Sequence, residues 1–124
     1  MTTLQVTLAD GVLITDADTP QLMFTSPDSA SPTNGLGTLV SVFNIANPSG
    51  SSVTYKLWIV PSGSSVADDF IIVPERELKT KDTDVPYEVA SQLMPANAKL
   101  YIECNTANVL SVRGSGVNIS TTAT

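Results

Sequence analysis

The sequence predicts an all-β fold, an antiparallel β-sandwich of jelly-roll or immunoglobulin-like type with about eight strands. The first observation is a strict alternation over residues 53–60, where one face consists of Val53, Tyr55, Leu57 and Ile59. A period of two held over the whole segment does not fit a single helical stripe. The second observation is that turn residues recur roughly every 8–12 residues, as in sandwiches and small barrels. The third is that no stretch has the pattern of an amphipathic helix of normal length.

A chain of 124 residues has the length of one domain with its own core, and we assign residues 1–124 to a single β-sandwich. Two parts of this domain are polar. Residues 26–37 form a long loop rich in Ser, Pro, Asn and Gly, and residues 120–124 form a polar tail. Such segments bury too little apolar surface to offset the entropy of ordering them, so any order must come from a neighbour.

The N-terminal part is expected to hold a short hairpin and a short strand. Residues 4–8 alternate apolar and polar side chains, Asp10-Gly11 supplies a two-residue turn, and residues 12–15 return. A type I′ turn needs positive φ at both central positions, which Gly accepts freely and Asp tolerates. Residues 21–25 are predicted to form the next strand.

The central part is expected to be a long hairpin. Two apolar and β-branched runs, residues 39–46 and 53–60, flank the break Asn47-Pro48-Ser49-Gly50-Ser51-Ser52. Two such runs separated by a short polar break are typical of antiparallel neighbours.

The C-terminal half adds shorter elements. A strand is predicted at 69–73, and the alternating charges of residues 75–82 indicate an exposed edge segment or a loop. The other predicted elements are a strand at 85–89, one helical turn at 90–94, a hairpin joining 100–104 to 109–113, a break at Gly114-Ser115-Gly116 and a final strand at 117–119.

Alternation also predicts which side chains form the core, although it cannot say which face is buried where both are apolar, as in residues 39–45. The predicted core residues are Val40, Val42, Tyr55, Leu57, Ile59, Ile71, Leu100, Ile102 and Val112.

The chain contains no histidine and one cysteine, and both facts bear on catalysis. Triads that use an imidazole base cannot be built, nor can zinc sites that need histidine or several thiolates. Cys104 is in phase with Leu100 and Ile102, which favours a small buried apolar residue over a catalytic thiol. We therefore expect no enzymatic activity and no cofactor.

Two acidic fragments, Asp16-Ala17-Asp18 and Asp82-Thr83-Asp84, are similar to parts of calcium loops. Neither is followed by the Gly and the bidentate Glu that complete an EF-hand, so solvated loops are favoured and no metal site is assigned. A net charge of −6 with six scattered basic residues argues against binding to nucleic acid. No apolar run is long enough to span a membrane, and the N-terminus has no signal-peptide pattern.

The order of parts from Val40 to Ile119 resembles small virion proteins of tailed bacteriophages. A strand ending in Asn44-Ile45-Ala46-Asn47 meets a Ser-Gly-Ser turn, and the next strand closes on Val60-Pro61-Ser62-Gly63. A loop at 94–97 introduces a further strand, and the chain then passes through Asn105-Thr106-Ala107-Asn108 to Ser115–Ile119. The resemblance implies a β-sandwich subunit that decorates a capsid or belongs to a neck or tail, without a catalytic motif.

From the resemblance and the composition, the favoured function is a capsid decoration (cement) protein. The alternatives are a neck or tail accessory protein and a carbohydrate- or receptor-binding module. The expected location is the virion after synthesis in the host cytoplasm. The expected partners are further copies of this chain, with a trimer favoured, and the major capsid protein or another virion protein.

Candidate interface residues lie in the polar loop, near the N-terminus and at the single tryptophan. Trp58 lies on the strand face opposite Tyr55, so it is either a core residue of the second face, which we favour, or an exposed anchor. The full set of candidates is Thr2, Leu4, Asn34, Leu36 and Trp58.

Overall fold

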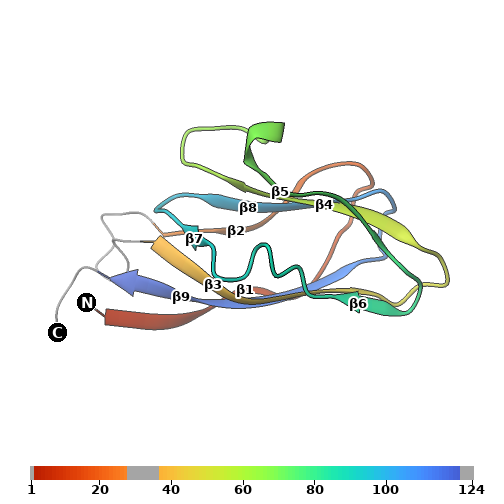
Figure 1. Cartoon of the computed structure of the whole chain (residues 1–124), viewed down its shortest axis with the longest axis horizontal. Coiled ribbons are helices and arrows are strands. Elements are labelled where there is room, and N and C mark those ends of the chain that lie inside the picture. Colours follow the sequence, from red (N-terminus) through yellow and green to blue (C-terminus); the bar gives the residue numbers. More distant parts are fainter. Residues whose placement is uncertain (1, 28–36, 121–124) are drawn as a thin grey trace.

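The computed structural model describes residues 2–27 and 37–120 and folds them into two antiparallel sheets packed face to face (Figure 1). The lower layer in Figure 1, sheet A, has the strand order β1–β9–β3–β6, and β7 also pairs with β3. Its strands are β1 (Thr2–Leu13), β3 (Gly37–Asn47), β6 (Asp82–Asp84), β7 (Leu93–Met94) and β9 (Ser111–Ser120).

The upper layer, sheet B, has the strand order β2–β8–β4–β5. Its strands are β2 (Gln21–Thr25), β4 (Val53–Val60), β5 (Ile71–Leu78) and β8 (Lys99–Cys104). The only helical element of the described residues is one 3₁₀ turn, η1 (Asp68–Phe70), which precedes β5. The described residues therefore contain no helix that is long and apolar enough to cross a membrane.

This strand order is that of a jelly roll. Apart from the β4–β5 pair, each long strand is followed along the chain by a strand of the other sheet. An immunoglobulin-like sandwich instead keeps several consecutive strands side by side in one sheet. The predicted all-β sandwich is thus confirmed, and the jelly-roll form of it is the one observed.

Two predicted hairpins are wrong for the same reason. Residues 39–46 and 53–60 form strands as predicted, but β3 belongs to sheet A and β4 to sheet B. Residues 100–104 form β8 in sheet B, whereas the strand after the 105–108 turn, β9, lies in sheet A. Alternation shows which side chains share a face but not which strand is the hydrogen-bonded neighbour, so a connection across the sandwich looks like a hairpin.

The predicted turn at Asp10-Gly11 is also wrong, because β1 continues through it while paired with β9. The register shifts between Asp10 and Val12, and Gly11 has a φ of 67°. A β-bulge uses a glycine in the left-handed region just as a type I′ turn does. Because β9 offers a partner along the whole of β1, the glycine bends the strand instead of reversing it.

Strand β9 runs through Gly114-Ser115-Gly116, where a break was predicted. A Cβ on Gly114 would lie 2.6 Å from Cδ1 of Phe43, and a Cβ on Gly116 would lie 2.5 Å from the carbonyl oxygen of Leu39. These glycines therefore serve close packing between β9 and β3, and they do not end the strand.

Residues 69–94 differ most from the prediction. The strand predicted at 69–73 begins at Ile71, after η1, and β5 then continues to Leu78 as an edge strand of sheet B. That position agrees with the exposed edge segment predicted there. The strand predicted at 85–89 is wrong, since these residues form a turn-rich connection, and the helical turn predicted at 90–94 is replaced by β7.

The core lies between the sheets and contains most of the predicted residues. Val40, Tyr55, Leu57, Leu100, Ile102 and Val112 are buried, Ile59 packs against them, and Ile71 is half-buried. The prediction that Val42 belongs to the core is wrong, because its side chain is 50% exposed. The register of β3 shifts between Val40 and Val42, so the extra residue Ser41 reverses the alternation and turns Val42 outward.

Candidate assembly surface

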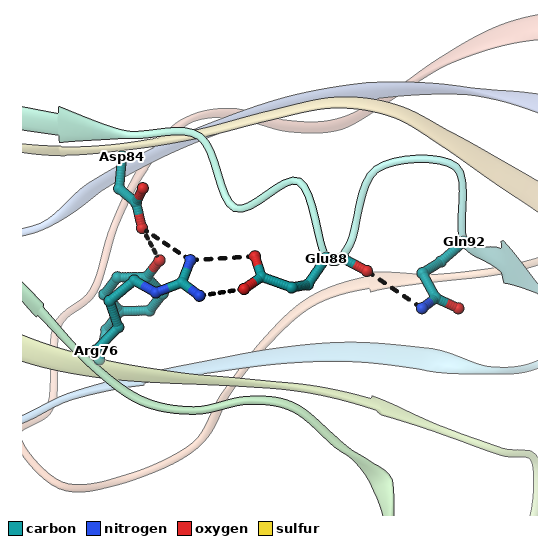
Figure 2. Close-up of polar contacts among 5 residues, drawn as sticks. Arg76, Asp84, Glu88 and Gln92 are labelled. Atoms are coloured by element: carbon teal, nitrogen blue, oxygen red, sulfur yellow. Dashed lines mark hydrogen bonds and ion pairs between the residues drawn. The ribbon is translucent and has the colours of Figure 1, made fainter.

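Four polar side chains join the two sheets at the edge where β5 and β6 lie. Tyr55 of β4 donates a hydrogen bond to the carboxylate of Asp84 in β6. The Arg76 guanidinium of β5 lies between Asp84 and Glu88, as Figure 2 shows. Its Nη1 is 3.4 Å from Asp84 Oδ2 and 3.1 Å from Glu88 Oε1, and its Nη2 donates to Glu88 Oε2. We call Tyr55, Arg76, Asp84 and Glu88 the inter-sheet brace.

The electrostatics of the brace favour a structural role. Burial, followed by the hydrogen bond to Asp84, raises the pKa of the Tyr55 hydroxyl, which therefore stays protonated as a donor. The hydrogen bond with Glu88 raises the pKa of Arg76, and the same bond lowers the pKa of Glu88. Tyr55, Arg76 and Glu88 are thus held in their ordinary charge states, and the pKa of none of these three is shifted toward that of a general acid or base near neutral pH.

The brace fixes a segment that we call the strap, residues 85–92. In Figure 1 it runs from β6 to β7 between the two layers. Its backbone bonds the free side of β3, where Val40 N donates to Gln92 O at 3.0 Å and Ser91 N donates to Val40 O at 2.7 Å. Glu88 is held by Arg76, and Val89 is fully buried. The strap is therefore anchored by an ion pair, by backbone hydrogen bonds and by the core.

The anchored strap presents apolar side chains to solvent. Tyr87 is 77% exposed and Val85 is 52% exposed, and Leu93, the first residue of β7, is 49% exposed. Exposed aromatic and aliphatic side chains on a fixed backbone are suited to an interface because little conformational entropy is lost on binding. Sequence reasoning missed these residues, since it placed 85–89 in a strand. The nearby Pro86 and Pro95 are the signal that favours an irregular segment here.

The predicted interface residues do not come together in the described structure. Trp58 is 5% exposed, which agrees with the favoured core role, and it lies outside the main core cluster. It pairs across the strands with Tyr101 and Ile71. Asn34 and Leu36 lie outside the described residues. Thr2 and Leu4 lie in β1, where only their backbone is described.

The base of the predicted 26–37 loop is fixed at both ends. Ser26 and Thr38 are fully buried, and their hydroxyl oxygens are 3.0 Å apart. The Thr38 hydroxyl donates to Asn118 Oδ1 at 2.7 Å, and Ser26 N donates to Ala98 O at 2.8 Å. Ser26 therefore belongs to the packed domain, and residues 28–36 of the loop lie outside the described residues.

Three other features of the described residues bear on a possible reaction: potential metal ligands, the single thiol and the surface hollows. Across residues 2–27 and 37–120, no group of three or more Cys, Asp or Glu could hold a metal ion. Cys104 is fully buried and unpaired, as predicted, and burial raises the pKa of its thiol. The hollows over β1, β9 and β3 have volumes of about 260 and 250 Å³, below the size typical of small-molecule sites.

Comparison with known proteins supports the fold. The sequence matches no protein-family model and no curated protein. Among solved structures, the chain is similar to a chain of the T13 viral particle of infectious bursal disease virus (IBDV), with a TM-score of 0.51 and 15% identity. The match covers 96% of this chain and 31% of the viral one, so this chain spans about a third of that protein.

A second similar structure is the coat protein of Tobacco streak virus. Its TM-score is 0.43 at 13% identity, and the match covers 98% of this chain and 90% of the coat protein. At 15% identity the similarity to the IBDV chain bears on the fold alone.

Proposed function

We propose that this chain is a non-enzymatic structural protein of a virion, and specifically a capsid decoration (cement) protein that stabilises the head lattice of a tailed phage. The observation that supports the proposal most is the jelly-roll strand order, together with the similarity to the IBDV particle chain over 96% of this chain. The phage assignment rests on the order of sequence motifs between Val40 and Ile119. The protein is proposed to be made in the host cytoplasm and to reside in the virion.

The proposed partner is the major capsid protein or another virion protein, and the strap is proposed as part of the contact. Tyr87, Val85 and Leu93 would supply its apolar centre, and the 26–37 loop and both termini would extend it as expected from the sequence. Many weak contacts on one particle become strong when the subunits are also linked to one another, because each bound subunit raises the effective concentration of the next.

A neck or tail accessory protein remains the alternative, since the same fold serves it equally well. The number of copies per purified particle decides between the two. A decoration protein occupies repeated head sites and is expected on the order of hundreds of copies, whereas a ring at a neck or tail has on the order of ten. Quantitative mass spectrometry of particles purified from the source measures this number. Absence from the particles would overturn the proposal.

The contribution of the strap is tested by substitution. We expect Tyr87→Ser to weaken binding to particles that lack the protein by about tenfold or more, about 1.4 kcal/mol, because an aromatic anchor is lost. Since Tyr87 is 77% exposed, the thermal unfolding temperature should hardly change.

The matched control for this variant is Leu22→Ser, which removes a 47% exposed apolar side chain from β2. Binding is measured by co-sedimentation with the particles. Equal loss of binding in both variants, or no loss in Tyr87→Ser, would show that the strap is not the contact. The copy number would then still stand as the separate test of virion membership.

A further inference from the structure

The two edges of sheet A are built differently. On one side, both ends of β3 are covered by the chain that follows β5, because β6 pairs with residues 45–47, the strap bonds Val40, and β7 pairs with residues 38–39. On the other side, β1 pairs only with β9. Within the described residues, no strand covers the outer edge of β1, which is the longest strand of the molecule.

The chemistry of the β1 edge also differs from that of the other edges. Residues 2–9 contain no charged residue and no proline. The edge strand β5, in contrast, carries Pro74 and the charged residues 75–77, features that prevent an edge from pairing with another chain. Strand β2 is uncharged but short, and its register shifts between Leu22 and Phe24.

The regular part of β1 is long enough to pair. Its ladder with β9 is continuous from Thr2, opposite Ser120, to Thr7, opposite Ser115, and the first register shift follows at Leu8. Asp10 is the only charged residue of β1 and lies beyond this segment, where its Oδ1 is 3.7 Å from Arg113 Nη2. An extended segment with free backbone donors and acceptors on one side is the template for adding a strand.

We propose that β1 pairs antiparallel with β1 of a second copy of this chain, across a two-fold axis at Gln5, so that sheet A continues through both copies. A second copy suits this edge because its own β1 segment is equally uncharged. Each copy carries a net charge of −6, and like charges opposite each other destabilise a ladder, so two copies pair at the least electrostatic cost along an uncharged segment. In this register residues 3–7 pair with residues 7–3 of the second copy, and no two charges lie opposite each other.

This contact gives a dimer in place of the trimer expected from the sequence, because a two-fold interface closes on itself. It does not depend on the proposed virion function, since it is a property of the isolated chain. It is also separate from the strap, which covers the opposite edge of sheet A.

The experiment measures the mass of the purified full chain by size-exclusion chromatography with light scattering, between about 1 μM and about 1 mM, the range of weak to moderate dissociation constants. The wild-type chain is expected to approach twice 13.0 kDa as its concentration rises. Gln5→Lys with Thr7→Lys places like charges on both copies at exposed positions of the edge and is expected to raise the dissociation constant at least about tenfold.

The matched control is Ser65→Lys with Thr83→Lys, which makes the same charge change at exposed positions of the connection before η1 and of β6, neither of which pairs with β1. It should dimerise as the wild type does. A monomer at all concentrations, a trimer, or equal weakening in the two double variants would overturn the proposal.

A second measurement needs no substitution and so remains decisive if a variant fails to fold. Amide hydrogen exchange of the wild-type chain should slow in residues 2–7 as its concentration rises, while exchange in β5 stays unchanged. Exchange in residues 2–7 that does not depend on concentration would rule out pairing at this edge.

Discussion

At the scale of single residues, the fold depends on a few polar side chains that join elements distant in the sequence. Asn47 is 1% exposed, and its Nδ2 donates to the carbonyl oxygens of Ser51, Leu78 and Lys79 at 2.8, 3.1 and 3.2 Å. It thereby fixes the connection from β3 to β4 against the end of β5. Buried amides and hydroxyls are costly unless they are paired, so such positions tolerate substitution poorly.

The Thr38 hydroxyl tests this cost directly. In Thr38→Val, the shape is kept, but Asn118 Oδ1 and the Ser26 hydroxyl each lose a partner. We expect the free energy of unfolding to fall by about 1–3 kcal/mol, the usual cost of leaving a buried polar group unpaired. Urea unfolding followed by circular dichroism measures it. The control is Thr83→Val in β6, an exposed position where almost no change is expected.

Glu88 gives the fold a dependence on acid. Because Arg76 lowers the pKa of Glu88 below its ordinary value of 4.5, the folded state binds the carboxyl proton more weakly than the unfolded state does. The stabilisation is complete above pH 4.5 and is lost as the pH falls through the lower folded value. We expect Glu88→Gln to flatten this part of the curve of unfolding free energy against pH. An unchanged acid slope in the variant would contradict the ion pair.

At the scale of elements, bulges and glycines decide how the strands of sheet A fit together. The register of β1 shifts at Leu8 and that of β3 at Ser41, and both shifts lie opposite residues 114–116 of β9. There, the glycines of β9 leave room for the ring of Phe43 and for the backbone of Leu39, both in β3. The bulge in β3 is also the reason that Val42 faces solvent while Phe43 is fully buried.

Alanine substitution of the β9 glycines tests this packing. Gly116→Ala would place a Cβ 2.5 Å from the backbone oxygen of Leu39, which cannot move without disturbing the ladder. We expect a loss of about 1–3 kcal/mol, the typical cost of overpacking, measured by thermal or urea unfolding. Gly50→Ala is the control, since nothing lies within 4 Å of its added Cβ, and it should be neutral or slightly stabilising.

At the scale of the whole molecule, one core shared by both sheets implies that they unfold together. Cys104 of β8 can be used to test this, because its thiol is completely buried in that core. We expect it to react with a thiol reagent only when the whole domain opens, so its reactivity and the β signal in circular dichroism should change at the same urea concentration. Reaction under conditions where the β signal is intact would show that sheet B opens by itself.

The fold class, most of the strand positions and most of the core could be predicted from the order of the amino acids. Strand β2 was predicted with its observed bounds and β4 likewise, because period-two alternation and turn residues are local properties of the chain. The exposure of Glu75 and Glu77 on an edge strand and the burial of Cys104 were also predicted, since charge and phase within a strand can be read without a partner.

Only the tertiary structure decided which strands are neighbours, and with that the location of the candidate surfaces. The residues Asp10-Gly11 and Gly114-Ser115-Gly116 are compatible both with a turn and with an irregular strand. Whether a turn or a strand forms therefore depends on the partner strand that is available. The strap was missed because its position depends on Arg76 reaching Glu88 across the sandwich edge and on hydrogen bonds to Val40. Such long-range contacts produce no periodic pattern in the sequence, whereas the two faces of a single strand produce an alternation of apolar and polar residues.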